Sequence, residues 1–195
     1  KHYRLQQDKL SELANQLQEV AHLDPLTHIY NRRYLVEYLN KKMKIESQKF
    51  AVVLLDIDDF KSINDQYGHI YGDQTLQTFS DSMKKNMDNK GIVTRFGGEE
   101  FMLVFDDINH EVIEDTLNKV AEEFALYGKQ SKGIELSFSG GVEVFYQEDE
   151  IVKLFNWADH KLYYAKHTGK RLFLISMFNI NTCVSLYWIY KVIPI

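Results

Sequence analysis

Four carboxylates in this sequence follow apolar runs that are typical of β-strands, at a spacing suited to binding a cation. Asp56 and Asp58 come at the end of the run FAVVLL (residues 50–55), and because they are two positions apart their side chains point to one face of an extended chain. Glu99 and Glu100 follow two glycines. If the strands that carry Glu99 and Glu100 pair beside the first strand, the four acids would converge. Negative charges at such short distances raise one another's pKa. The arrangement favours a divalent cation, and hard oxygen ligands favour Mg²⁺ or Mn²⁺.

The neighbouring residues predict the strands that must position these acids. The run FAVVLL is continuous and rich in large and β-branched residues, which is typical of a strand buried on both faces. Residues 92–96 and 101–105 predict two further strands, and Gly97-Gly98 between them predicts a tight two-residue turn. The two glycines, which lack Cβ atoms, would also let a nucleotide approach the turn backbone closely.

Helices alternate with these strands along the chain. The spacing of apolar residues predicts helices at residues 32–46, 75–87, 111–127 and 151–166. Asp24-Pro25 and Asn31 have the residue types of helix starts. Residues 136–144 predict a strand with a bend at Gly140-Gly141, and a last strand is expected near residues 172–175. This alternation predicts an α/β domain whose central sheet is covered by helices.

Length and composition limit the classes to which the protein can belong. With 195 residues, 45% of them hydrophobic, and two prolines, the chain is expected to fold as one domain with an appendage. The net charge of −5 argues against holding a nucleic-acid backbone on a wide basic surface, but allows a small anionic ligand. No Walker-type or Gly-x-Gly-x-x-Gly motif is present. The single cysteine, Cys183, favours a cytoplasmic protein over a disulfide-bonded one.

The first 22 residues predict a helix with an apolar seam. Its apolar positions follow a 3-4-3 spacing: Leu10, Leu13, Leu17 and Val20. Such a helix either dimerises as a signalling helix or lies on its own domain, and we expect the former. The chain begins with Lys1 and shows no signal segment, so we expect it to be a piece of a longer protein.

The last residues form an apolar tail, expected as an extension at residues 177–195 after a domain at residues 23–176. Residues 172–190 carry no charge, and a helix rising about 1.5 Å per residue could almost span a bilayer with them. The last predicted strand needs the first of these residues, however, and several polar residues interrupt the rest. We therefore expect a packed extension rather than a membrane helix.

Residues 97–101 spell GGEEF, which resembles the hairpin motif of the GGDEF-domain diguanylate cyclases. Further motifs similar to that family follow in its order and spacing: residues 24–27 (DPLT), 31–33 (NRR), 56–61 (DIDDFK), 64–65 (ND), 68–69 (GH), 72–73 (GD), 158–166 (ADHKLYYAK) and 169–170 (GK). The resemblance covers about residues 23–175. It implies an α/β fold of the α+β sandwich type, with a mainly antiparallel central sheet flanked by helices, similar to nucleotidyl cyclases and polymerase palm domains.

The resemblance also implies an activity. The family joins two GTP molecules into cyclic di-GMP and releases pyrophosphate. Because one domain of this family binds one GTP, the resemblance implies a homodimer for catalysis. The chain would be the output domain of a longer signalling protein with an upstream sensor. No nucleic-acid partner is expected, and membrane attachment is expected only through a missing upstream region, if at all.

Roles for the acids follow from the same resemblance. Asp56, the backbone carbonyl of Ile57 and Glu99 would hold Mg²⁺ or Mn²⁺, with Glu100 beside them. Asp56, Glu99 and Glu100 form the implied catalytic set, in which the glutamate that accepts the proton is left open. Asp58 is expected to orient the site rather than to bind the metal.

Substrate-binding residues are implied in the same way. Asn64 and Asp73 match the guanine-reading pair, since a carboxylate accepts hydrogen bonds from the N1 and N2 donors of guanine and adenine cannot satisfy it. The other implied contacts are to the phosphates or to the nucleotide at the turn: Phe60, Lys61, Gly97, Gly98, Lys166 and Lys170.

The sequence departs from the family at one regulatory motif. The family's product-inhibition motif, Arg-x-x-Asp, corresponds to residues 88–91 (DNKG), so we expect no inhibitory product site here. The alternative to an active cyclase is a catalytically silent GTP-sensing or protein-interaction domain, which predicts a damaged hairpin or the loss of Asp56. A polymerase or an adenylyl cyclase is disfavoured by the acidic net charge and by Asp73.

Overall fold

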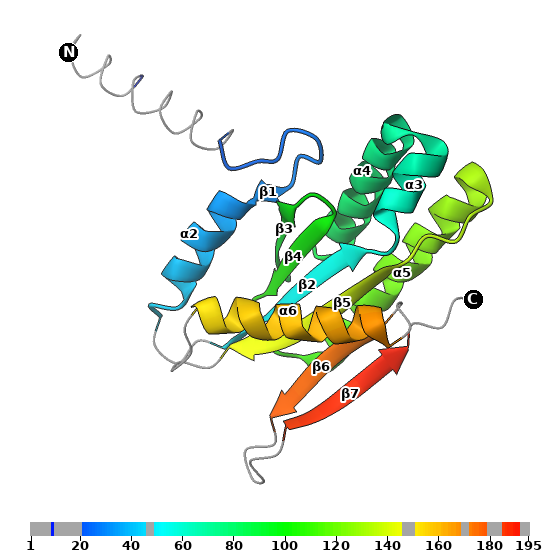
Figure 1. Cartoon of the computed structure of the whole chain (residues 1–195). Coiled ribbons are helices and arrows are strands. Elements are labelled where there is room, and N and C mark those ends of the chain that lie inside the picture. Colours follow the sequence, from blue (N-terminus) through cyan, green and yellow to red (C-terminus); the bar gives the residue numbers. More distant parts are fainter. Residues whose placement is uncertain are drawn as a thin grey trace.

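The computed structural model describes residues 9, 21–45, 49–145, 151–168, 172–178 and 185–191. Within them, one mixed sheet has the strand order β1-β3-β4-β2-β5-β6-β7 (Figure 1). Its strands are β1 (Tyr30–Asn31), β2 (Phe50–Ile57), β3 (Gly91–Gly97), β4 (Glu100–Phe105), β5 (Phe138–Phe145), β6 (Leu172–Phe178) and β7 (Ser185–Lys191). The pairs β1–β3 and β5–β6 are parallel and the others are antiparallel. The expected α/β class with a mainly antiparallel sheet is confirmed.

Helices cover both faces of this sheet (Figure 1). They are α2 (Arg32–Lys42), α3 (Phe60–Tyr67), α4 (His69–Asn86), α5 (His110–Lys132) and α6 (Ile151–His167). Apolar residues of α3, α4 and α5 form a core with one face, and those of α2 and α6 form a second core with the other. The sheet is therefore the middle layer of a sandwich, as the alternation of elements predicts.

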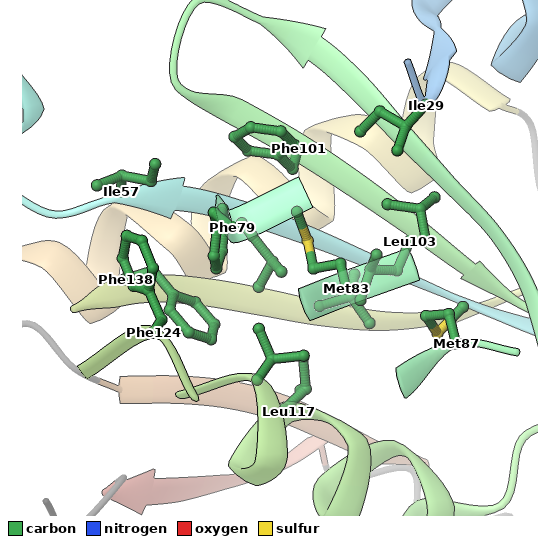
Figure 2. Close-up of a cluster of buried hydrophobic side chains, with 14 of the residues drawn as sticks. Ile29, Ile57, Phe79, Met83, Met87, Phe101, Leu103, Leu117, Phe124 and Phe138 are labelled. Carbon is green, nitrogen blue, oxygen red and sulfur yellow. The ribbon is translucent and has the colours of Figure 1, made fainter. Parts of the chain in front are cut away.

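Strand β2 is buried along its whole length, which confirms the interpretation of FAVVLL as a strand covered on both faces. Its alternate side chains enter the two cores, for example Val53 and Leu55 on the α4–α5 side and Val52 on the α2–α6 side. In the first core, Phe79 of α4 packs against the rings of Phe101, Phe124 and Phe138 (Figure 2). This packing fixes the strands whose ends carry the acids.

Two turn predictions need correction. Strand β3 runs through Gly97, so the two turn residues of the hairpin are Gly98 and Glu99, one position later than expected. The reason is an irregularity between Arg95 and Gly97, which shifts the register of β3 on β4 by one residue. The expected bend in β5 is absent as well, because β5 pairs with β2 along all eight of its residues.

The two ends of the chain are described in part. The expected seam residues Leu10, Leu13, Leu17 and Val20 lie outside the described residues. In the tail, β7 pairs antiparallel with β6, so part of the expected extension is an edge strand of the same sheet. No helix among the described residues is long and apolar enough to cross a membrane. The domain boundaries expected near residues 22 and 176 stay predictions.

Candidate active site

Three of the expected acids meet at one end of the β2–β4 pair. Asp56 lies directly opposite Glu100 in the antiparallel ladder, so the two side chains leave the same face of the sheet. Glu99 lies in the adjoining turn, and its carbonyl oxygen accepts a hydrogen bond from the N–H of Ile57, with an N···O distance of 3.3 Å. The hairpin turn is thereby fastened to the last residue of β2.

The electrostatics of these acids show a site with excess negative charge. Asp56 is only 7% exposed, and this burial raises its pKa. Burial also raises the pKa values of Glu99 and Glu100, and the charge of Asp56 raises both further. Lys166 of α6 opposes these shifts, because its Nζ lies 2.6 Å from Asp56 Oδ1. For Glu100, the charge of Asp159 adds to the upward shift, and Arg32 opposes it together with Lys166.

The expected metal ligands, which are Asp56, the Ile57 carbonyl and Glu99, stay a prediction. Among the described residues, no three His, Cys, Asp or Glu side chains are placed to hold a metal ion together. The donors still fit a hard divalent cation in their chemistry, since carboxylate oxygens with uncompensated charge are the ligands that such cations prefer.

Hydrogen bonds hold Asp58 at the end of β2, and its expected role of orienting the site stays a prediction. Its carboxylate accepts hydrogen bonds from the hydroxyl groups of Ser137 and Ser139, each at 2.8 Å, and its N–H donates to the Ser137 carbonyl. Ser139 is also the ladder partner of Asp56 on β5. The sequence analysis missed both serines. The only pattern in the sequence that could have indicated them is weak, since it consists of two polar residues, two positions apart, at the start of a buried strand.

The two expected guanine-binding residues lie on neighbouring helices. Asn64 of α3 packs so closely on α4 that a Cβ atom at Gly72 would lie 1.9 Å from Asn64 Oδ1. The next residue of α4 is Asp73, which is exposed. Because only Asp58 and Asp59 separate β2 from α3, helix α3 begins close to the acids.

The remaining predicted residues have mixed positions. Phe60 buries its side chain in the core, so only its backbone is free to contact a phosphate. Lys61 is exposed in the first turn of α3. Gly97 ends β3 and Gly98 lies in the hairpin turn. Lys170 lies outside the described residues.

Arg95 is a further residue of the hairpin that the sequence analysis missed. Its Nε and Nη2 donate to the Gly98 carbonyl at 3.1 and 2.8 Å, and its Nη1 lies 3.1 Å from Asp24 Oδ1. Asp24 does not start a helix as expected. Its carboxylate instead accepts from the N–H and hydroxyl of Thr27 and closes a turn. Arg95 therefore ties that turn to the hairpin that carries Glu99.

This arrangement agrees with the comparisons to known proteins. The family model described as "Diguanylate cyclase, GGDEF domain" matches residues 21–172. The chain belongs to the GGDEF domain family of diguanylate cyclases. This GGDEF domain is 35% identical over 169 residues to the probable diguanylate cyclase DgcF of Escherichia coli, covering 83% of this chain and 53% of that protein. The chain spans about half or less of the length of the curated relatives that it matches.

Solved structures share the fold of this GGDEF domain. The coiled coil and GGDEF domain of DgcB from Caulobacter crescentus, in complex with c-di-GMP, gives a TM-score of 0.80 at 22% identity, covering 89% of this chain and 95% of that one. The active GGEEF domain of a diguanylate cyclase from Vibrio cholerae gives 0.67 at 28% identity, covering 74% and 96%. The first likeness supports the fold alone.

Proposed function

We propose that this GGDEF domain, in the GGEEF variant of residues 97–101, condenses two GTP molecules into cyclic di-GMP and two pyrophosphates. The observation that carries the proposal is the ladder pairing of Asp56 with Glu100, with Glu99 and Lys166 beside it. In each step the 3′-oxygen of one GTP forms a bond to the α-phosphorus of the other. The bond from that phosphorus to the bridging oxygen of pyrophosphate breaks, and the hydroxyl proton passes to a carboxylate.

Each side chain of the site has a task in this reaction. Asp56, the Ile57 carbonyl and Glu99 would hold Mg²⁺ or Mn²⁺, with Glu100 adjacent, and the bound cation neutralises triphosphate charge and lowers the pKa of the attacking hydroxyl. Glu99 or Glu100 accepts the proton of the attacking hydroxyl group. Lys166 supplies positive charge to the triphosphate.

Asn64 and Asp73 select guanine over adenine. The Asp73 carboxylate accepts from the N1 and N2 donors of guanine, and Asn64 reads the same base from α3. Adenine has no N2 amino group, so it would leave the carboxylate without its partners. Lys61 and Lys170, with the Phe60 backbone, contact the phosphates.

Assembly and cellular context form part of the proposal. One domain holds one GTP, so the chain acts as a homodimer in which each copy offers its 3′-hydroxyl to the other's substrate. It is the output domain of a longer signalling protein whose upstream sensor controls this pairing. Its GTP substrate and single cysteine favour the cytoplasm, with any membrane attachment through the upstream region.

The test is direct product formation. The purified chain, incubated with GTP and Mg²⁺, is expected to release pyrophosphate and cyclic di-GMP, and ATP is expected to give no cyclic product. Asp56→Asn should lower the rate by about 100-fold or more. Asp81→Asn, at an exposed position of α4, is the matched control and should retain activity. GTP binding without product in the parent protein would instead favour the silent GTP-sensing domain.

A further inference from the structure

A buried ion pair fastens α6 to the sheet behind the candidate site. Lys161 of α6 and Glu143 of β5 are 5% and 4% exposed. Lys161 Nζ donates to the Val142 carbonyl at 2.6 Å and to Glu143 Oε2. Burial lowers the pKa of Lys161, while the charge of Glu143 opposes that shift. The pair is therefore buried between α6 and β5.

The same region of α6 lies unusually close to β5. A Cβ atom at Gly141 would lie 2.3 Å from the Ala158 carbonyl oxygen and 2.7 Å from Lys161 Cβ. Around this contact, α6 presents the buried apolar side chains Ala158, Leu162 and Ala165 to the sheet. Apolar packing of this kind is non-directional. The ion pair adds directional hydrogen bonds, and these form only when α6 lies in one position on β5.

Stability alone does not account for this pair. Removing two charges from water costs several kcal/mol, and well-packed apolar residues in their place are often neutral or stabilising. The pair is also close to the site: Lys161 precedes Lys166 by five residues, or about 7.5 Å along the helix axis. Lys166 is the residue whose Nζ reaches Asp56 on β2. In Figure 1, α6 crosses the sheet in front of β2 and β5.

We propose that Lys161 and Glu143 are positioning residues for Lys166. Their pair fixes where α6 lies along and around its axis on β5, and so holds the Lys166 ammonium at Asp56 and at the triphosphate of the substrate. This inference rests on the proposed cyclase function. Neither Lys161 nor Glu143 touches the substrate, so their effect must pass through Lys166.

A thermodynamic cycle tests this route. The double variant Lys161→Met/Glu143→Leu replaces the pair with apolar side chains of similar size. It is made in the parent chain and in a Lys166→Ala background, and kcat/KM for GTP and Kd for a non-hydrolysable GTP analogue with Mg²⁺ are measured. In the parent, kcat/KM is expected to fall about tenfold while Tm is not lowered. With Lys166 already removed, the same replacement should change kcat/KM less than about twofold.

Two controls separate positioning from general damage. Lys85→Met/Glu123→Leu removes another ion pair, between α4 and α5, and is expected to act equally in both backgrounds. Lys161→Arg keeps the positive charge, and it replaces the double variant in the cycle if Lys161→Met/Glu143→Leu does not fold. Lys161→Arg is expected to lower kcat/KM in the parent chain and to leave kcat/KM unchanged in the Lys166→Ala background.

Two outcomes would overturn the inference: an unchanged kcat/KM in the double variant, or an equal loss in both backgrounds. A parent chain that makes no cyclic di-GMP refutes the proposed function instead. The inference is then decided by the Kd cycle, in which equal losses in the two backgrounds reject it.

Discussion

Asp56 and Glu100 face each other across the β2–β4 ladder, and neither is fully exposed. Asp56 is the last residue but one of β2, and Glu100 is the first residue of β4. Burial raises the pKa of Asp56, and burial together with the charge of Asp56 raises the pKa values of Glu99 and Glu100. Such a pair costs folding free energy when it is ionised and uncompensated. The site is therefore strained electrostatically in favour of cation and substrate binding, and this can be measured.

Glu100→Gln is expected to stabilise the metal-free protein at neutral pH. Since burial and Asp56 raise the folded-state pKa of Glu100, its favourable contribution is present below the unfolded pKa and is lost as pH rises through the folded pKa. The glutamine of the variant does not ionise, so the variant does not lose this contribution to stability at neutral pH. Its Tm at pH 7, measured with a chelator present, should exceed that of the parent by about 2–4 °C. Near pH 4 the gain should vanish. Glu122→Gln, at an exposed position of α5, is the control, and an equal gain at both pH values would contradict the prediction.

Gly72→Ala is expected to weaken GTP binding without unfolding the protein. The new Cβ would meet Asn64 Oδ1 at 1.9 Å, and because that atom ends a flexible side chain, Asn64 swings away rather than α4 moving. Loss of one hydrogen bond to the base should raise KM for GTP about 5- to 10-fold. Tm should be unchanged or slightly higher, since alanine favours a helix. Gln74→Ala is the exposed control on the same helix, and an unchanged KM in Gly72→Ala would reject the role of Asn64.

Arg95→Lys is expected to lower kcat more than stability. Lysine has a single donor group and cannot hold both the Gly98 carbonyl and Asp24 as the guanidinium does. The turn that carries Glu99 would lose its orientation, and kcat should fall about tenfold. Initial-rate kinetics and thermal unfolding measure the two effects. Lys119→Arg on α5 is the control, and a large fall in Tm with unchanged kcat would show that Arg95 serves folding alone.

Cyclic di-GMP is expected not to inhibit this protein through residues 88–91. Gly91 has φ +147°, and a Cβ there would lie 1.8 Å from the Val104 carbonyl oxygen, so an aspartate at this position is strained. Grafting the family motif as Asp88→Arg/Gly91→Asp should cost about 1–3 kcal/mol of stability. Asp88→Arg alone should cost little. A product titration that shows submicromolar inhibition, altered by Asp88→Ala, would refute the prediction.

The sequence predicted the elements that depend on local pattern. The apolar run of β2, the helical spacing of α4 and α5 and the N-cap at Asn31 are properties of neighbouring residues, and each is found in the structure. The motif letters GGEEF and DIDDFK likewise identified the family, because its site residues lie in short continuous segments. Turn positions were less predictable, since the register of β3 on β4 is set by pairing with another strand.

Contacts between distant segments were decided only by the tertiary structure. Lys166 and Asp56 are 110 residues apart, and no local pattern shows that α6 docks on β5 so as to bring them together. The same holds for Ser137 and Ser139 on Asp58, and for Lys161 on Glu143. Sequence alone therefore determined which acids and bases this protein has and on which elements they lie. The packing of α6 on the sheet decided which acidic group each basic group neutralises, because electrostatic interaction depends on distance in space.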